Sequence, residues 1–290
     1  MENTTYKVIL FYKFLQIENP EALRNEQLQI CAKIGLKGRL LIAKEGINGT
    51  FEGTESQVDE YKKIMYSNPS FSDLVFKESE GDGRGFTKLS IKVRKEVVTL
   101  GIGDVDFSKT AKEITAEELD ELYEKKEDFV VLDLRNDFEI EVGQFEKTYN
   151  PNLENFRSLG SKLEKLDSLK DKKVVAVCTG GIRCEKATCL LNEVGFKDLY
   201  QLKDGIHTYI QRFPGKRFKG SLFVFDNRMT TPVVDTKERE IIGRCIYCKE
   251  KCEEFYSDDS QRPSKKIICC SLCAAHKSNL RKPLPLQYQN

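Results

Sequence analysis

The chain of 290 residues contains no tryptophan and only two histidines, His207 and His276. So few histidines argue against a Ser-His-Asp triad and against an iron site with histidine ligands. A Gly-x-Gly-x-x-Gly phosphate loop is also missing, so the sequence predicts no flavin or nicotinamide cofactor. The chemistry must therefore depend on cysteine, acidic residues and arginine.

Long apolar runs and an excess of charge are missing as well. No run approaches the roughly 20 residues that span a bilayer, and residues 1–8 lack the apolar stretch of a signal peptide. Lys and Arg number 47 and Asp and Glu 46, so any attraction for a polyanion must be local. We expect a soluble, cytoplasmic protein that does not bind membranes.

Cysteine, in contrast, is abundant. Six of the ten cysteines lie in residues 245–273, and the other four lie in apolar segments. This distribution favours reduced thiols with chemical roles over a disulfide scaffold. The length allows two domains and an appendage. The expected parts are domains at 1–100 and 114–235, a linker at 101–113 and a cysteine-rich segment at 236–290.

The first domain shows alternating strand and helix signals. Leu23, Ile30 and Ile34 share one face of a predicted helix, and the Asn48-Gly49 dipeptide predicts a turn between two strands. The pattern as a whole is βαββαβ, which is the ferredoxin-like or acylphosphatase-like arrangement of the α+β class. The other expected elements are strands 8–14, 38–43, 74–77 and 89–93, a short strand that ends at 53, and helix 55–68.

The second domain continues with a β-α-β alternation. Thr115 and Glu118 form a capping box that opens a helix. The apolar runs 129–132 and 174–177 are typical of strands buried on both faces of a parallel sheet, so we predict a parallel-sheet α/β domain. Helices are expected at about 153–169 and 184–194, and a last strand at 222–225.

A cysteine follows the strand 174–177 directly. Cys178 begins a loop of four residues and is followed by Arg183 at the start of a helix. Loop amides and a helix amino terminus that point at one sulfur lower its pKa and hold an anion attached to it. Cys178 is therefore predicted to be a nucleophile or the carrier of a persulfide; the alternative is a buried cysteine with a packing role. The loop residues of this anion cradle are Thr179, Gly180, Gly181 and Ile182.

The segment from Cys178 to Arg183 resembles the reactive loop of the rhodanese family, and its spacing favours sulfur over phosphate. Asp133 and Arg135 are similar to the family's first-strand signature, and we expect them to form a buried ion pair that supports the loop. Cys184, on the helix that follows, is either a resolving thiol or a packing residue. The family's terminal motif is matched by Gly205, Ile206 and Tyr209.

The combination of segments 11–14, 45–50, 178–187 and 218–226 resembles the rhodanese-containing tRNA uridine-34 hydroxylases. The resemblance implies an oxidoreductase that forms 5-hydroxyuridine at the wobble position of tRNA, with molecular oxygen as co-substrate and an essential Cys178. A Cys178 persulfide as the reductant is a hypothesis. Two alternatives remain open: a sulfurtransferase that takes sulfur from a donor, and a non-enzymatic scaffold.

The carboxyl-terminal segment carries a Cys-x-x-Cys pair, Cys245 and Cys248, and a second pair about twenty residues later, Cys270 and Cys273. That spacing suits a structural zinc site of four thiolates, with free or disulfide-bonded cysteines as the alternative. Spare candidate ligands are Cys252, Cys269 and His276.

Two clusters of basic residues are candidates for tRNA binding, and the alternative for both is a solvated charged surface. Phe213 and Phe218 flank the second cluster and could stack on a base. The first cluster consists of Arg84, Lys88, Lys92, Arg94 and Lys95, and the second of Arg212, Lys216, Arg217 and Lys219.

Overall fold

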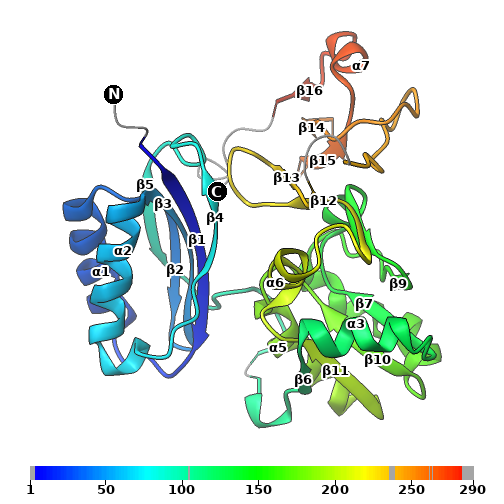
Figure 1. Ribbon diagram of the computed structural model, residues 1–290, viewed down its shortest axis with the longest axis horizontal. Coiled ribbons are helices and arrows are strands. Elements are labelled where there is room, and N and C mark those ends of the chain that lie inside the picture. Colours follow the sequence, from blue (N-terminus) through cyan, green and yellow to red (C-terminus); the bar gives the residue numbers. More distant parts are fainter. Residues whose placement is uncertain (1–3, 104, 235–238, 261, 263, 283–290) are drawn as a thin grey trace. The chain divides into compact units, whose positions relative to one another are not determined.

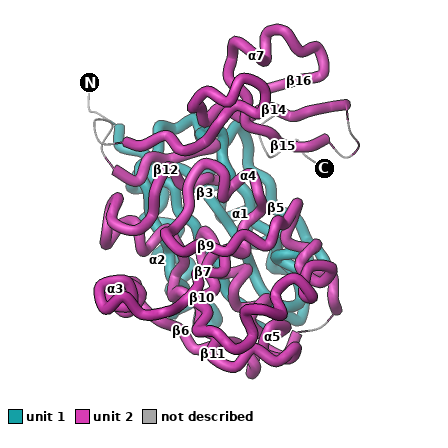
Figure 2. Tube along the Cα trace, turned by 90° about the vertical axis from the view of Figure 1, so that its right-hand side faces the viewer, with its two compact units in different colours: residues 1–99, 225–228, 284–290 teal, residues 100–224, 229–283 magenta. Residues whose placement is uncertain are grey.

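The computed structural model describes residues 4–103, 105–234, 239–260, 262 and 264–282. The chain divides into two compact units, which Figure 2 colours separately. Within the described residues, unit 1 contains 4–99 and 225–228, and unit 2 contains the rest. The described part of the chain contains no helix long and apolar enough to cross a membrane.

Unit 1 is a five-stranded sheet with two helices on one face (Figure 1), and the predicted ferredoxin-like class is confirmed. The strand order is β4-β1-β3-β2-β5, and every pair is antiparallel except β2 with β5. Its elements are β1 Tyr6–Phe14, α1 Pro20–Ile34, β2 Lys37–Ala43, β3 Gly46–Thr54, α2 Glu55–Ser67, the 3₁₀ turn η1 Pro69–Phe71, β4 Lys77–Gly81 and β5 Leu89–Val93.

Local signals explain where the two helices begin and end. Asn19 caps α1 by accepting a hydrogen bond from the Ala22 amide, and Gly35 ends the helix with a φ of 88°. Thr54 and Gln57 form a capping box at the start of α2. The helices bury their apolar faces against the sheet, in a core that includes Ile9, Phe11, Leu40, Ile47, Phe51 and Tyr61.

Two predictions for unit 1 are wrong. The Asn48-Gly49 dipeptide lies inside β3 rather than in a turn, and the chain reverses between Ala43 and Gly46. Asn48 instead donates to the carbonyl of Val97 at 3.0 Å, and a Cβ on Gly49 would lie 2.5 Å from the ring of Phe11. The strand expected at 74–77 runs from Lys77 to Gly81, because the preceding turn buries Leu74 in the core.

Unit 2 contains the predicted parallel sheet, with strand order β6-β11-β10-β7-β9. The same unit also contains a smaller sheet with the strand order β13-β12-β8. The elements are η2 Phe107–Lys109, β6 Lys112–Ile114, α3 Ala116–Glu124, β7 Phe129–Asp133, α4 Asp137–Ile140, β8 Gly143–Phe145, β9 Thr148–Tyr149, η3 Phe156–Leu169, β10 Lys173–Val177, α5 Ile182–Glu193, β11 Asp198–Leu202, α6 Gly205–Arg212, β12 Phe218–Phe223 and β13 Thr230–Pro232.

Three local predictions for unit 2 need correction. The edge strand β6, Lys112–Ile114, begins inside the stretch 101–113 that was expected to be a linker. The helix expected at 153–169 is the 3₁₀ helix η3, where Ser158 and Ser161 hydrogen-bond to backbone carbonyls three residues earlier. The strand expected at 222–225 is the end of β12, and further strands follow it.

The cysteine-rich segment forms a third small sheet, β15-β14-β16, within unit 2. Phe255 of this sheet packs edge-on against Phe223 with ring centroids 5.1 Å apart, and Lys266 lies 5.0 Å over the ring of Phe138. These contacts attach the segment to α4 and β12. Its elements are β14 Phe255–Asp258, β15 Lys265–Ile268, α7 Ser271–Ala275 and β16 Leu280–Arg281.

Candidate active site and cysteine cluster

Cys178 follows β10, which lies between β7 and β11 in the parallel sheet. Its side chain is fully buried. The amide of Gly181 donates to Cys178 Sγ at 3.2 Å, and Gly181 has a φ of 102° that glycine adopts without strain. The loop therefore wraps one turn of backbone around the sulfur and aims an N–H at it.

The amino terminus of α6 holds this loop in place. The amides of Ile206 and His207 donate to the carbonyls of Cys178 and Thr179 at 2.9 and 3.0 Å. A Cβ at Gly205 would lie 2.6 Å from the Cys178 carbonyl oxygen, so only glycine allows this close approach. Gly205 and Ile206, identified from the sequence as a terminal motif, thus act by clamping the reactive loop.

Burial alone raises the pKa of the Cys178 thiol, but opposing interactions outweigh it. A hydrogen bond with the Cys184 thiol, the charge of Arg183 and the amides of both residues lower the pKa to about 6. Cys178 is therefore largely a thiolate at neutral pH, which is the nucleophilic form.

Cys184 has the opposite environment. It is buried, and burial, together with the hydrogen bond to Cys178 and the charge there, raises its pKa well above the usual range. The pair thus consists of one thiolate and one thiol that donates to it. The structure brings these two cysteines together.

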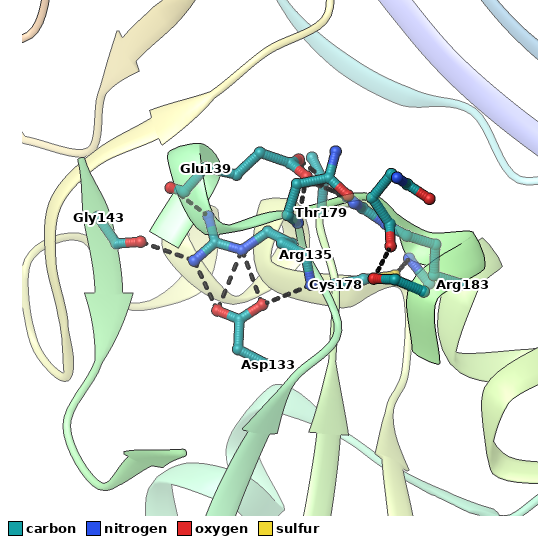
Figure 3. Close-up of polar contacts among 11 residues, drawn as sticks. Asp133, Arg135, Glu139, Gly143, Cys178, Thr179 and Arg183 are labelled. Atoms are coloured by element: carbon teal, nitrogen blue, oxygen red, sulfur yellow. Dashed lines mark hydrogen bonds and ion pairs between the residues drawn. The ribbon is translucent and has the colours of Figure 1, made fainter. Parts of the chain in front are cut away.

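Arg183 lies beside the loop but is bound to an acid that sequence reasoning missed (Figure 3). Its guanidinium donates to both carboxylate oxygens of Glu139, at 2.6 and 2.9 Å, and to Thr179 Oγ1 at 3.2 Å. Glu139 is fully buried; burial raises its pKa, but the charges of Arg183 and Arg135 and the Asn136 amide bring the net shift downward. The signal for Glu139 in the sequence was its position three residues after Asn136, which is the spacing of a capping box. The Asn136 amide donates to the Glu139 carboxylate at 2.8 Å.

The predicted ion pair between Asp133 and Arg135 is present, and both side chains are fully buried. Arg135 also donates to the carbonyls of Gly143 at 2.6 Å and Glu139 at 3.3 Å (Figure 3). Arg135 therefore ties the end of β7 to α4 and β8. Because Glu139 on α4 binds Arg183, this network supports the reactive loop, and the hydrogen-bond partners of Arg135 are Asp133, Glu139 and Gly143.

The second cysteine site lies in the carboxyl-terminal segment. Cys245, Cys248, Cys270 and Cys273 place their sulfur atoms within 4.8 Å of one another, with 3.7 Å between those of Cys248 and Cys270. Four thiolates around one zinc ion at about 2.3 Å would be separated by about 3.8 Å, so the set fits tetrahedral zinc. These four are the ligands predicted from the spacing, and the cluster could bind a metal such as zinc.

The three spare candidates are outside this set. Cys269 Sγ lies 4.0 Å from Cys245 Sγ but hydrogen-bonds to the carbonyl of Cys270, and burial raises its pKa to about 12. Cys252 is buried, and burial likewise raises its pKa to about 11. His276 is exposed where α7 ends.

The two basic clusters differ in their surroundings. The first lies in unit 1, where all members except the half-buried Lys92 are exposed. The second lies in unit 2, where Lys216 and Arg217 form ion pairs with Asp120 and Glu124. Lys219 donates to the carbonyls of Gly215 and Lys216. The cations of the second cluster are therefore mostly bound to acidic side chains and carbonyls of unit 2.

Known families match three parts of the chain. Residues 6–97 match the UPF0176 acylphosphatase like domain, residues 115–212 the rhodanese-like domain, and residues 219–282 the rhodanase C-terminal family. The second match contains the Cys178 loop, and the third contains the four-cysteine cluster.

Full-length relatives match as well. A tRNA uridine(34) hydroxylase of Bacillus licheniformis is 40% identical over 272 residues, covering 91% of this chain and 83% of the relative. Proteins of the same name from Bacillus cytotoxicus and Bacillus cereus are each 41% identical over 271 residues and cover 91% of this chain and 82% and 84% of their own lengths. The chain therefore belongs to the tRNA uridine(34) hydroxylase family.

Proposed function

We propose that this protein hydroxylates uridine 34 of tRNA to 5-hydroxyuridine, with Cys178 as the reactive cysteine and molecular oxygen as co-substrate. The observation that carries the proposal is the geometry of the loop, in which the amide of Gly181 donates to the buried Cys178 Sγ and Arg183 lies in the first turn of the following helix. The chain is also similar along 91% of its length to proteins named for this reaction. The proposed protein is thus a cytoplasmic tRNA-modifying oxidoreductase.

Hydroxylation with oxygen requires two electrons from a reductant. A C–H bond at C5 of uracil becomes C–OH, and the second oxygen atom leaves as water once two electrons and two protons are supplied. Oxidation of two thiols to one disulfide supplies both. Cys178 and Cys184 are hydrogen-bonded to each other and can act as this pair.

A persulfide on Cys178 is the other source of electrons. The outer sulfur would then take the second oxygen atom and become a sulfenic acid, so that no water forms in that step and the sulfur is oxidised by two electrons. Two thiols of a dithiol reductant would restore the persulfide, because they form a disulfide and the oxygen of the sulfenic acid leaves as water. Mass spectrometry separates the two cases, because the first leaves a Cys178–Cys184 disulfide and the second leaves added sulfur and oxygen on Cys178.

The charge that holds tRNA is assigned to the first basic cluster. Its members Arg84, Arg94 and Lys95 are exposed, whereas Lys216 and Arg217 of the second cluster are bound to acids of unit 2. Phosphate contacts by exposed basic side chains release counterions and give salt-dependent affinity. Zinc, if bound by the four cysteines, would stabilise the carboxyl-terminal segment.

The test is in vitro hydroxylation of tRNA isolated from cells that lack this protein. Wild-type protein, a dithiol reductant and heavy-isotope oxygen gas should yield 5-hydroxyuridine with one heavy oxygen atom, measured by nucleoside mass spectrometry. Cys178→Ser should yield none. If thiouridine forms instead, the protein is a sulfurtransferase; unchanged tRNA together with unchanged nucleosides in a deletion strain would leave only a scaffold.

A further inference from the structure

One face of the sheet in unit 1 carries no helix of that unit, as far as its described residues go. Both α1 and α2 lie on the opposite face, over Phe11 and Phe51 (Figure 1). Side chains alternate between the two faces of a strand. The residues between the core positions, such as Tyr12 on β1 and Arg39 on β2, therefore point to this second face, which we call the open face.

The pairing of the strands arranges the residues of the open face in rows. The central strands β1 and β3 supply Leu10, Tyr12 and Thr50, and β2 supplies Arg39. These four side chains are half-buried, so each retains accessible atoms. Lys77 on β4 also belongs to this face, but it is buried. One row contains Lys77, Leu10, Thr50, Arg39 and Ser90, and the next contains Tyr12, Asn48, Leu41 and Lys92.

The charge of the open face is positive. Arg39, Lys77 and Lys92 are its cations within these rows. Glu52 is the acid at the strand positions of this face, and its carboxylate already accepts the amides of Gly83 at 2.9 Å and Phe86 at 3.3 Å. A ligand for such a surface must be an anion.

Arg39 is the residue of the open face best placed to bind an anion. It lies on β2 between Thr50 and Ser90 of the neighbouring strands and is half-buried, and no hydrogen bond or ion pair joins its guanidinium to any residue that the structure describes. Guanidinium groups bind phosphate or carboxylate through two parallel hydrogen bonds. Thr50 and Ser90, its direct neighbours across the strands, add hydroxyl groups for the same ligand.

Tyr12 is a half-buried aromatic residue of the open face. It lies on a central strand, and the ammonium group of Lys77 is 5.1 Å from the centre of its ring. Sheets that bind single-stranded RNA use aromatic rings on their central strands in this way, and each stacked base contributes about 1–3 kcal/mol. Leu10 and Leu41 add apolar contacts on either side.

We propose that the open face binds a single-stranded RNA segment, with Arg39 and Lys92 on its phosphates and Tyr12 stacked on a base. The inference rests on the proposed function, and the segment is accordingly the anticodon loop of tRNA, in which uridine 34 is unpaired. The exposed residues Arg94 and Lys95 extend the positive charge beyond the sheet.

The test compares two labelled RNAs, a hairpin with an anticodon loop containing uridine 34 and a fully paired duplex of equal length. Tyr12→Leu and Arg39→Gln should each weaken hairpin binding about 10-fold, because each removes one stacked base or one charged phosphate contact. Duplex binding should change less than about twofold, since a paired helix offers no splayed base. Arg39→Gln should also reduce the salt slope of hairpin binding by about 0.7.

Two matched controls make the result specific. Tyr12→Phe keeps the ring and should bind the hairpin like wild type, and Lys63→Gln removes one exposed charge from α2 on the opposite face. Wild-type affinity in Arg39→Gln and Tyr12→Leu, or equal loss on hairpin and duplex, would overturn the inference. Hydroxylation by wild-type protein is measured on the same samples: weakened binding without any 5-hydroxyuridine from wild type would refute the proposed function and leave the RNA surface standing.

Discussion

The reactive loop and the four-cysteine cluster use the same side chain for opposite purposes. Around Cys178, hydrogen-bond donors and an arginine surround one sulfur and lower its pKa to about 6. In the cluster, four sulfur atoms lie within 4.8 Å of one another. The surroundings of a sulfur therefore decide what it can do: one thiol donor, backbone amides and an arginine favour a nucleophile, and four thiols grouped around one point could bind a metal.

The two sites also differ in what holds them. The loop at Cys178 is supported by β10, the clamp from α6 and the buried pair of Arg183 with Glu139. The cluster is built on short elements, and α7, which follows Cys270, buries none of its residues. The loop should keep its geometry without any ligand, whereas the cluster should depend on a metal for its order.

Replacing the loop sulfur tests the comparison most severely. Cys178→Ser should reduce hydroxylation at least about 1000-fold, because a serine hydroxyl neither ionises near neutral pH nor passes through disulfide or persulfide states. The melting temperature and the zinc content should stay at wild-type values. Nucleoside mass spectrometry, thermal unfolding and metal analysis on one preparation measure all three, and substantial activity would move the reactive centre away from Cys178.

Replacing a cluster sulfur should have the converse effect. Cys270→Ser should lower bound zinc from about one ion per chain to a small fraction, since three thiolates hold zinc far more weakly than four. Limited proteolysis should then cut within residues 245–273 faster than in wild type. Alkylation of Cys178 should continue at the wild-type rate.

Cys252→Ser is the matched control for this change, because Cys252 is buried nearby but lies outside the four-thiol set. Normal zinc content in Cys270→Ser, or equal zinc loss in Cys252→Ser, would contradict the assigned ligands.

These two sites also show what sequence can provide. The position of Cys178, the Thr115 capping box and the grouping of the two Cys-x-x-Cys pairs were predicted, because each depends on short spacings along the chain. Glu139 was missed as the partner of Arg183 because the two lie 44 residues apart. The Asn48-Gly49 dipeptide was misassigned because its role depends on Phe11 and Val97, which only the folded sheet brings near.

The buried pair behind the loop can be broken one member at a time. Arg183→Met should destabilise unit 2 by about 3–5 kcal/mol, because Glu139 is left buried and charged, and Glu139→Gln should do the same to Arg183. The double variant should recover most of the stability, since two neutral residues replace a buried ion pair at little cost. Denaturant unfolding of the four proteins measures this cycle, and additive losses would mean that the pair is not coupled.

The activity of the double variant Arg183→Met, Glu139→Gln separates the structural role of Arg183 from its effect on Cys178. The amide of Gly181 still faces Cys178, but the charge of Arg183 is gone, so we expect a partial loss of about 10- to 100-fold. The thiolate should also form at higher pH. Wild-type activity would reduce Arg183 to a purely structural residue.

The smallest change concerns the thiol of Cys184. In wild type, the fraction of Cys178 in the thiolate form should rise as the pH increases through about 6, and the rate of alkylation by iodoacetamide should follow it. Cys184→Ala removes a hydrogen-bond donor, so this midpoint should move to higher pH; Cys184→Ser keeps a donor and should move it less.

The same Cys184→Ser variant tests where the electrons come from. With excess dithiol reductant, the serine variant should retain hydroxylation within a few-fold of wild type. Without reductant, wild type should still complete about one turnover by forming the Cys178–Cys184 disulfide, and the serine variant should not. A full first turnover in Cys184→Ser would show that the electrons come from elsewhere, and sulfur added to Cys178 in the same spectrum would identify the persulfide as their source.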